Sequence, residues 1–285
     1  MLHTGLSQDV IDRLPTPKGV ALALTQACRR DDANLDEIAR LVNMDPALSG
    51  RLLALANAAA LGGRSVVSVE EAVSRMGLVR VSQVALAFSL IDQHGSGACA
   101  NFDYAGFWNR SLLMAAASRV FGSLRKLGVA GELFTVGLLA QIGLLGLATA
   151  FPQEYSELVG QDLGRAELLQ QEQAQLHTNH RDLSVAMLEH WGIPVEYSKP
   201  FGQYESSPPE LGANAAPSAL RAQLAHSCWL LADMLARDGS EAALDHPGCV
   251  AALAWLRLER EDLQAQLQEI EAVWRVWLVL ISKKG

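Results

Sequence analysis

Three histidines lie within one short stretch of the chain and are the residues best suited to metal chemistry. His177 and His180 are three residues apart, and His190 follows them. On a helix, this first spacing places two imidazoles on one face, as in some helical metal sites. No set of carboxylates or thiolates in the sequence completes a site around them. The pattern therefore predicts surface or capping histidines.

Other chemistry-bearing motifs are missing from the sequence. The glycine pair Gly143 and Gly146 has no GxxxxGK pattern around it, so it indicates helix stops or close packing between helices. No G-x-S-x-G elbow is present for nucleophilic catalysis. The four cysteines are far apart and form no C-x-x-C pair, so we expect neither disulfides nor a thiolate metal site.

The elements that must position these residues are all predicted to be helices, because apolar residues recur at helical spacing from about residue 20 onward. Capping boxes start helices after Asn34 and Ser68, and Pro46 starts another. Longer helices are expected at about 103–121, 130–149, 162–176 and 181–191. The segments 94–100 and 206–218 interrupt the pattern, since they are rich in small residues or proline.

Composition narrows the class of protein further. Hydrophobic residues make up 50% of the 285 residues and charged residues 19%, which is typical of a globular chain. The net charge of -8 disfavours nucleic acid as the main partner. The N-terminal residues do not form a signal peptide, and we find no apolar run of about 20 residues for a membrane span. These features predict a cytoplasmic protein with no membrane span.

Several passages resemble the HDOD family, whose domains are related to the HD hydrolases. They are LPTP at 14–17, LVNMDPALSGRLLALAN at 41–57 and VEEAVSRMGLVRV at 69–81 in the first lobe. FWNRS at 107–111, LLAQIGLLGL at 138–147, FPQEY at 151–155 and MLEHWGIP at 187–194 are similar to parts of the second lobe. The resemblance covers about residues 10–205 and implies an all-α, two-lobed fold in a bacterial signalling protein.

The chain departs from this resemblance at the metal ligands. HD hydrolases hold divalent metals with a His-Asp doublet and further His and Asp residues, and these metals activate water. Here the doublet position holds Ala140 and Gln141, and Arg110 replaces the first histidine. The corresponding positions of a vestigial pocket would be Arg110, Ala140, Gln141, His180, Gln203 and Asp233. Only His180 and Asp233 could still bind metal, so the resemblance implies no metal, no cofactor and no catalytic residues. Arg110 in such a pocket would favour an anionic ligand.

The last helix carries a seam that the resemblance does not explain. Apolar residues recur at alternating steps of four and three, at Leu263, Leu267, Ile270, Trp274, Trp277 and Ile281. Leu267, Ile270, Trp274 and Trp277 could pack on the protein's own helices, or they could form a dimer or partner surface.

We therefore expect an N-terminal helical lobe at 1–93, a degenerate HD-like lobe at 101–205, and C-terminal helices at 219–285 that complete or extend it. The expected function is that of a regulatory module that binds other signalling proteins, with an anionic ligand of the vestigial pocket as an added possibility. Two alternatives stay open, a phosphohydrolase with altered metal ligands and a transcription regulator.

Overall fold

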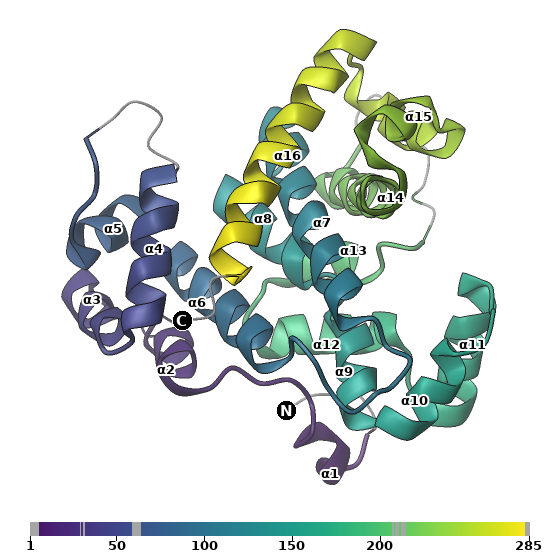
Figure 1. The fold of residues 1–285 in the computed structure, drawn as a ribbon, viewed down its shortest axis with the longest axis horizontal. Helices are drawn as coiled ribbons and strands as arrows, with labels where there is room; N and C mark the ends of the chain where they lie inside the picture. Colours follow the sequence, from purple (N-terminus) through teal and green to yellow (C-terminus); the bar gives the residue numbers. More distant parts are fainter. Residues whose placement is uncertain are drawn as a thin grey trace. The chain divides into compact units, whose positions relative to one another are not determined.

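The computed structural model describes residues 6–28, 30, 32–58, 64–206, 208, 211 and 215–282. Within these ranges every regular element is a helix and no strand is present, which confirms the predicted all-α class (Figure 1). The chain forms two compact units. Unit 1 comprises Met1–Pro15 and His94–Glu271, and unit 2 comprises Thr16–Gln93 and Ala272–Gly285.

The division between the units falls partly where the sequence suggested. One boundary lies between Gln93 and His94, at the start of the segment 94–100. The structure differs from the expected lobes at both chain ends, because residues 1–15 belong to unit 1 and residues 272–285 to unit 2. The last helix, α16 (Arg260–Ser282), therefore contributes residues to both units.

Unit 2 is built from short helices with well-defined starts. They are α2 (Gly19–Ala27), α3 (Leu35–Asn43), α4 (Pro46–Ala58), α5 (Val69–Met76) and α6 (Leu78–Gln93). The side chains of Asn34 and Ser68 accept hydrogen bonds from the backbone N–H groups of Glu37 and Glu71, at 2.9 and 3.2 Å. Both capping predictions are thereby confirmed, and each cap satisfies an otherwise unpaired donor of the first turn.

The end of α16 completes the core of unit 2 around Phe88. The indole of Trp277 stacks on the Phe88 ring with centroids 5.0 Å apart. The guanidinium of Arg51 lies 4.6 Å from the centroid of the same ring and forms two hydrogen bonds with Asp92, of 2.5 and 3.0 Å. Phe88 and Trp277 are both buried, so the second half of α16 is part of this unit's core.

Unit 1 contains the remaining helices. They are α1 (Gln8–Ile11), α7 (Tyr104–Leu124), α8 (Ala130–Leu139), α9 (Ile142–Ala150), α10 (Pro152–Val159), α11 (Arg165–Leu176), α12 (His180–His190), α13 (Val195–Gly202), α14 (Pro217–Asp245), α15 (Pro247–Leu253), the 3-10 turn Ala254–Leu256 and the start of α16. Helix α7 packs against α8 and α14, and α12 packs against α9 and α13. The predicted break at 206–218 falls between α13 and α14, where residues 207, 209–210 and 212–214 lie outside the described residues.

The expected helix at 130–149 is two helices, because the chain turns at Ala140 and Gln141. The prediction that no apolar run reaches membrane-spanning length is also corrected, since Ala130–Ala150 meets that length and hydropathy. However, 89% of its most apolar window is buried inside the protein, as in the core helices of globular domains. The four cysteines are free thiols, as expected.

Candidate functional site: a buried Glu-His-Glu cluster

The residues at the position of the HD doublet are packed into the core of unit 1. Ala140 is fully buried and Gln141 is 4% exposed. The amide Nε2 of Gln141 lies 3.8 Å from the sulfur of Met114 on α7. These side chains serve packing between α7, α8 and α9 in the structure.

Arg110 and Asp233 are instead engaged in ion pairs near the surface. Arg110 lies 3.8 Å from Asp103, which caps α7. Asp233 on α14 pairs with Arg165 at 3.0 Å and with Arg237 at 3.3 Å. Among the described residues no hydrogen bond or ion pair joins either residue to Gln141 or to His180, so such contacts do not bring the six expected residues together.

His180 is buried, which overturns the prediction that it is a surface or capping histidine. It is the first residue of α12, and the Asn179 side chain caps this helix by accepting from the N–H groups of Arg181 and Asp182. Helix α9 holds it closely, because a Cβ on Gly143 would lie 1.9 Å from the His180 carbonyl oxygen. The close-packing role expected for Gly143 is thus confirmed. His177 and His190 are exposed, as predicted.

Two carboxylates hold the His180 ring from opposite sides. The Nδ1 atom lies 2.6 Å from Oε2 of Glu172 on α11, and the Nε2 atom lies 3.1 Å from Oε2 of Glu205 beyond α13. The backbone N–H of His180 also donates to Glu172, at 2.9 Å. Because an ionised carboxylate only accepts hydrogen bonds, both ring nitrogens must carry protons. The cluster is therefore an imidazolium between two glutamates.

The electrostatics of the cluster agree with this assignment. Burial alone would lower the pKa of His180, since it penalises the charged ring. The hydrogen bonds and negative charges of Glu172 and Glu205 outweigh burial and raise the pKa from 6.5 to about 9. The imidazolium is thus the form present at neutral pH.

Two buried tyrosines surround the cluster. The pKa of Tyr155 and that of Tyr204 are raised well above 10, first by burial and then by the glutamates. The Tyr204 ring lies 6.5 Å from the His180 ring and 5.4 Å from Trp229, measured between centroids. The Tyr155 hydroxyl and the Oε1 atom of Glu172 are buried with no partner at normal hydrogen-bond distance among the described residues, although Glu172 is close enough to Tyr155 to help raise its pKa.

The side chains of this cluster do not provide a ligand set for a divalent metal ion. A metal takes a lone pair from imidazole, but both nitrogens of His180 already face carboxylates. An ion at Nε2 would have two ligands from this cluster, His180 and Glu205, because Glu172 lies at the other ring nitrogen. Among the described residues no group of three or more His, Cys, Asp or Glu side chains could hold a metal ion.

Sequence reasoning missed Glu172 and Glu205. Glu172 had a detectable signal, because it stands between Leu169 and Leu176 at helical spacing and so occupies the inward face of α11. Glu205 follows α13 in a turn and has no periodic pattern to mark it.

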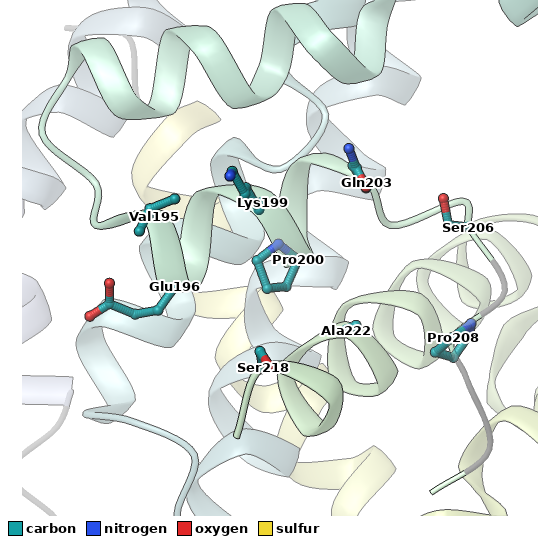
Figure 2. Close-up of a pocket in the computed structure, with 9 residues that line it drawn as sticks. All are labelled: Val195, Glu196, Lys199, Pro200, Gln203, Ser206, Pro208, Ser218 and Ala222. Atoms are coloured by element: carbon teal, nitrogen blue, oxygen red, sulfur yellow. The ribbon is translucent and has the colours of Figure 1, made fainter. Parts of the chain in front are cut away.

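A cavity of about 430 Å³ lies next to the turn that carries Glu205. It is lined by residues of α13 and of the start of α14, and by Gln203, Ser206 and Pro208 between these helices (Figure 2). Of the residues expected to form a vestigial pocket, the cavity contains only Gln203, whose side chain is exposed. We call this cavity the α13–α14 groove.

Among the described residues the fold is all-helical, as in HDOD domains. The model of the HDOD domain matches residues 14–206. The chain belongs to the HDOD family. A search among curated proteins finds no significant match.

Solved structures agree with this assignment. The chain is 34% identical to the MmoQ response regulator of Methylococcus capsulatus strain Bath, over 90% of this chain and 99% of that one, with a TM-score of 0.57. An HDOD domain protein of Geobacter sulfurreducens is 20% identical over 90% and 93% of the chains, with a TM-score of 0.59. A protein of Shewanella amazonensis SB2B, provisionally named a phosphohydrolase, is 17% identical over 99% and 100%, with a TM-score of 0.72. The last two similarities concern the fold alone. The family and the response-regulator relative are consistent with a regulatory role.

Proposed function

We propose that this protein is a non-catalytic regulator in signal transduction that acts by binding other proteins. The observation that carries the proposal is the state of His180. This residue could bind metal and stands where the resemblance places a ligand of the HD hydrolases. Both of its nitrogens are bound to glutamates, at 2.6 and 3.1 Å. A metal ion at Nε2 would have to displace a proton from a buried ring, and it would then find two ligands in the cluster, His180 and Glu205, where a catalytic metal needs three or more.

The remaining HD positions support the same conclusion. Alanine at position 140 offers no ligand atom, and the amide of Gln141 packs on Met114. The guanidinium of Arg110 cannot coordinate a metal ion, and it pairs with Asp103. Metal-dependent hydrolysis needs a metal with open coordination positions and an activated water, and these side chains do not supply the ligands for it.

The absence of hydrolysis is tested on the full chain. We expect no phosphodiesterase or phosphomonoesterase turnover with Mn²⁺, Fe²⁺ or Mg²⁺, and no stoichiometric metal in the purified protein. The matched variants are His180→Ala and His190→Ala, which remove one buried and one exposed ring from the same helix. Metal-dependent hydrolysis that disappears in His180→Ala and persists in His190→Ala would refute the proposal in favour of a phosphohydrolase.

The binding role is tested by site-specific photo-crosslinking in the native host. Crosslinkers placed at exposed positions of each unit should yield a defined protein adduct from a restricted set of positions. Adducts that contain DNA would instead favour the transcription regulator. A lack of any specific adduct from positions spread over both units would count against a protein-binding role.

A further inference from the structure

The α13–α14 groove has one wall that is fixed from the inside. Helix α13 buries Ser198 and Phe201 completely, while Lys199 on this helix and Gln203 directly after it line the groove. The guanidinium of Arg221 lies 4.4 Å from the ring centroid of Tyr197 and anchors α13 to α14. This wall needs little rearrangement to bind a ligand, which reduces the entropic cost of binding.

The turn after α13 is also held in place by buried contacts. Gln203 and Ser206 face the groove, while Tyr204 and Glu205 between them face inward. The Tyr204 carbonyl accepts a hydrogen bond from the His226 ring at 2.9 Å, and Glu205 binds His180. The groove wall is thus continuous with the buried cluster.

The groove has an apolar lining and an open rim. Its apolar residues are Val195, Pro200, Pro208 and Ala222. Val195 is 50% exposed, although it is a large hydrophobic residue. Lys199, Gln203 and Ser218 on the rim are exposed as well. Pockets for small molecules enclose most of their ligand, whereas this groove is open along its rim, as in surfaces that take one side chain of a peptide.

One cationic group of the lining, Lys199, has no carboxylate partner among the described residues, and Arg181 lies behind Ser206 outside the lining. Neither Lys199 nor Arg181 has an ion pair with any described residue. Arg181 contacts the Ser206 hydroxyl, and its Nε atom is buried without a hydrogen-bond partner among the described residues. Glu196 is the acidic residue of the lining, and Figure 2 shows its carboxylate and the Lys199 ammonium pointing in different directions.

We propose that the α13–α14 groove binds an extended segment of a partner protein in which an apolar side chain stands beside an acidic one. The apolar side chain covers Val195, Pro200 and Ala222, and the carboxylate lies on the side of Lys199. This assignment rests on the proposed protein-binding function and specifies where that binding occurs.

The test uses the full chain and two short, terminally blocked peptides in a Gly-Ser frame. One peptide carries Leu and Asp, and the other carries Leu and Lys at the same positions. Methyl NMR should show that the Asp peptide shifts the signals of Val195 and Ala222, while the Lys peptide binds much more weakly. Lys199→Glu should weaken binding of the Asp peptide about three- to tenfold, as expected for reversal of one charge at a rim.

A second variant tests the groove sterically. Ser218 is exposed and lines the groove, so Ser218→Trp should block binding without unfolding the protein. Lys18→Glu and Ser74→Trp are matched controls at exposed positions of unit 2 and should leave binding unchanged.

Several outcomes overturn the assignment. These are no shift at Val195 or Ala222 with millimolar peptide, equal binding of both peptides, or the same shifts with inorganic phosphate alone, which would indicate a small-anion site. If a partner found by crosslinking still binds the Lys199→Glu and Ser218→Trp proteins, the groove is wrong while the proposed function stands. Metal-dependent hydrolysis has the reverse effect, because it refutes the non-catalytic function and leaves the peptide result intact.

Discussion

Replacing His180 with leucine should expose how much the buried cluster contributes to stability. Leucine fills a similar volume but cannot donate to either glutamate. Glu172 is fully buried, so the variant leaves its charge without the ring that neutralises it. Glu205, whose side chain is 16% exposed, can turn toward water and suffers less.

The size of the effect follows from the burial of Glu172. Removing one partner of a buried ion pair costs about 3 to 5 kcal/mol, because the remaining charge stays desolvated. For domains of this size, 1 kcal/mol corresponds to roughly 2 to 4 °C in melting temperature. The His180→Leu protein should therefore melt roughly 10 °C below the wild type. Adding Glu172→Gln to this variant should restore about 1 to 2 kcal/mol, since it removes the unpaired charge.

Urea unfolding followed by circular dichroism measures these differences in the free energy of unfolding. His190→Leu is the matched control, because it makes the same change at an exposed position of the same helix. We expect it to change stability by less than about 0.5 kcal/mol. A loss below about 1 kcal/mol for His180→Leu would refute the buried ion cluster. A further loss on adding Glu172→Gln would show that Glu172 is not left as an unpaired charge.

Four other measurements address separate features of the protein. The contribution of His180 to the stability of the wild type should be fully present below a pH of about 6.5. About 3 kcal/mol of it should be lost as the pH rises through about 9, because the pKa of His180 is raised in the folded state. Urea unfolding at several pH values measures this loss, which should be absent in His180→Leu. Leu52→Ala should cost about 2 to 5 kcal/mol, since Leu52 is fully buried, and a loss under about 0.5 kcal/mol in urea unfolding would contradict that burial. Trp277→Ala should cost about 3 to 5 kcal/mol and abolish the stacking on Phe88, whereas a folded protein of unchanged stability and near-ultraviolet dichroism would place Trp277 at the surface. Chelator should leave the melting temperature unchanged, and a drop of several degrees would reveal a bound metal.

Local sequence rules were sufficient for much of the fold. The starts at Asn34, Pro46 and Ser68 are encoded within one helical turn, so the sequence alone predicts them. The break at Ala140 and Gln141 was missed because both flanking segments are apolar and no glycine or proline marks the turn itself. Residues on both sides are buried, so tertiary packing decides where the helix stops.

The candidate site was harder to predict because its contacts are distant in the chain. Glu172 lies eight residues before His180 and Glu205 lies 25 residues after it. Periodicity describes one helix at a time, and it cannot show that the end of α11, the start of α12 and the turn after α13 meet. An isolated histidine at a helix start is usually a surface residue. Here the two glutamates offset the free-energy cost of burying the ring.

The apolar seam of the last helix shows that a correct local pattern can predict a buried face without predicting which residues cover it. The spacing of Leu267, Ile270 and Trp277 predicts one buried face, and the structure buries all three. It places Leu267 and Ile270 in unit 1 and Trp277 in unit 2, where Trp277 stacks on Phe88.

The HDOD match ends at residue 206, yet the core of unit 2 includes an indole from position 277. A protein cut at the end of the family match would lose the stacking partner of Phe88 and leave this aromatic ring more exposed to water. The end of helix α16 is therefore a structural part of unit 2. Any partner that contacts this helix must use its outer side, where Val276 and Val279 are exposed.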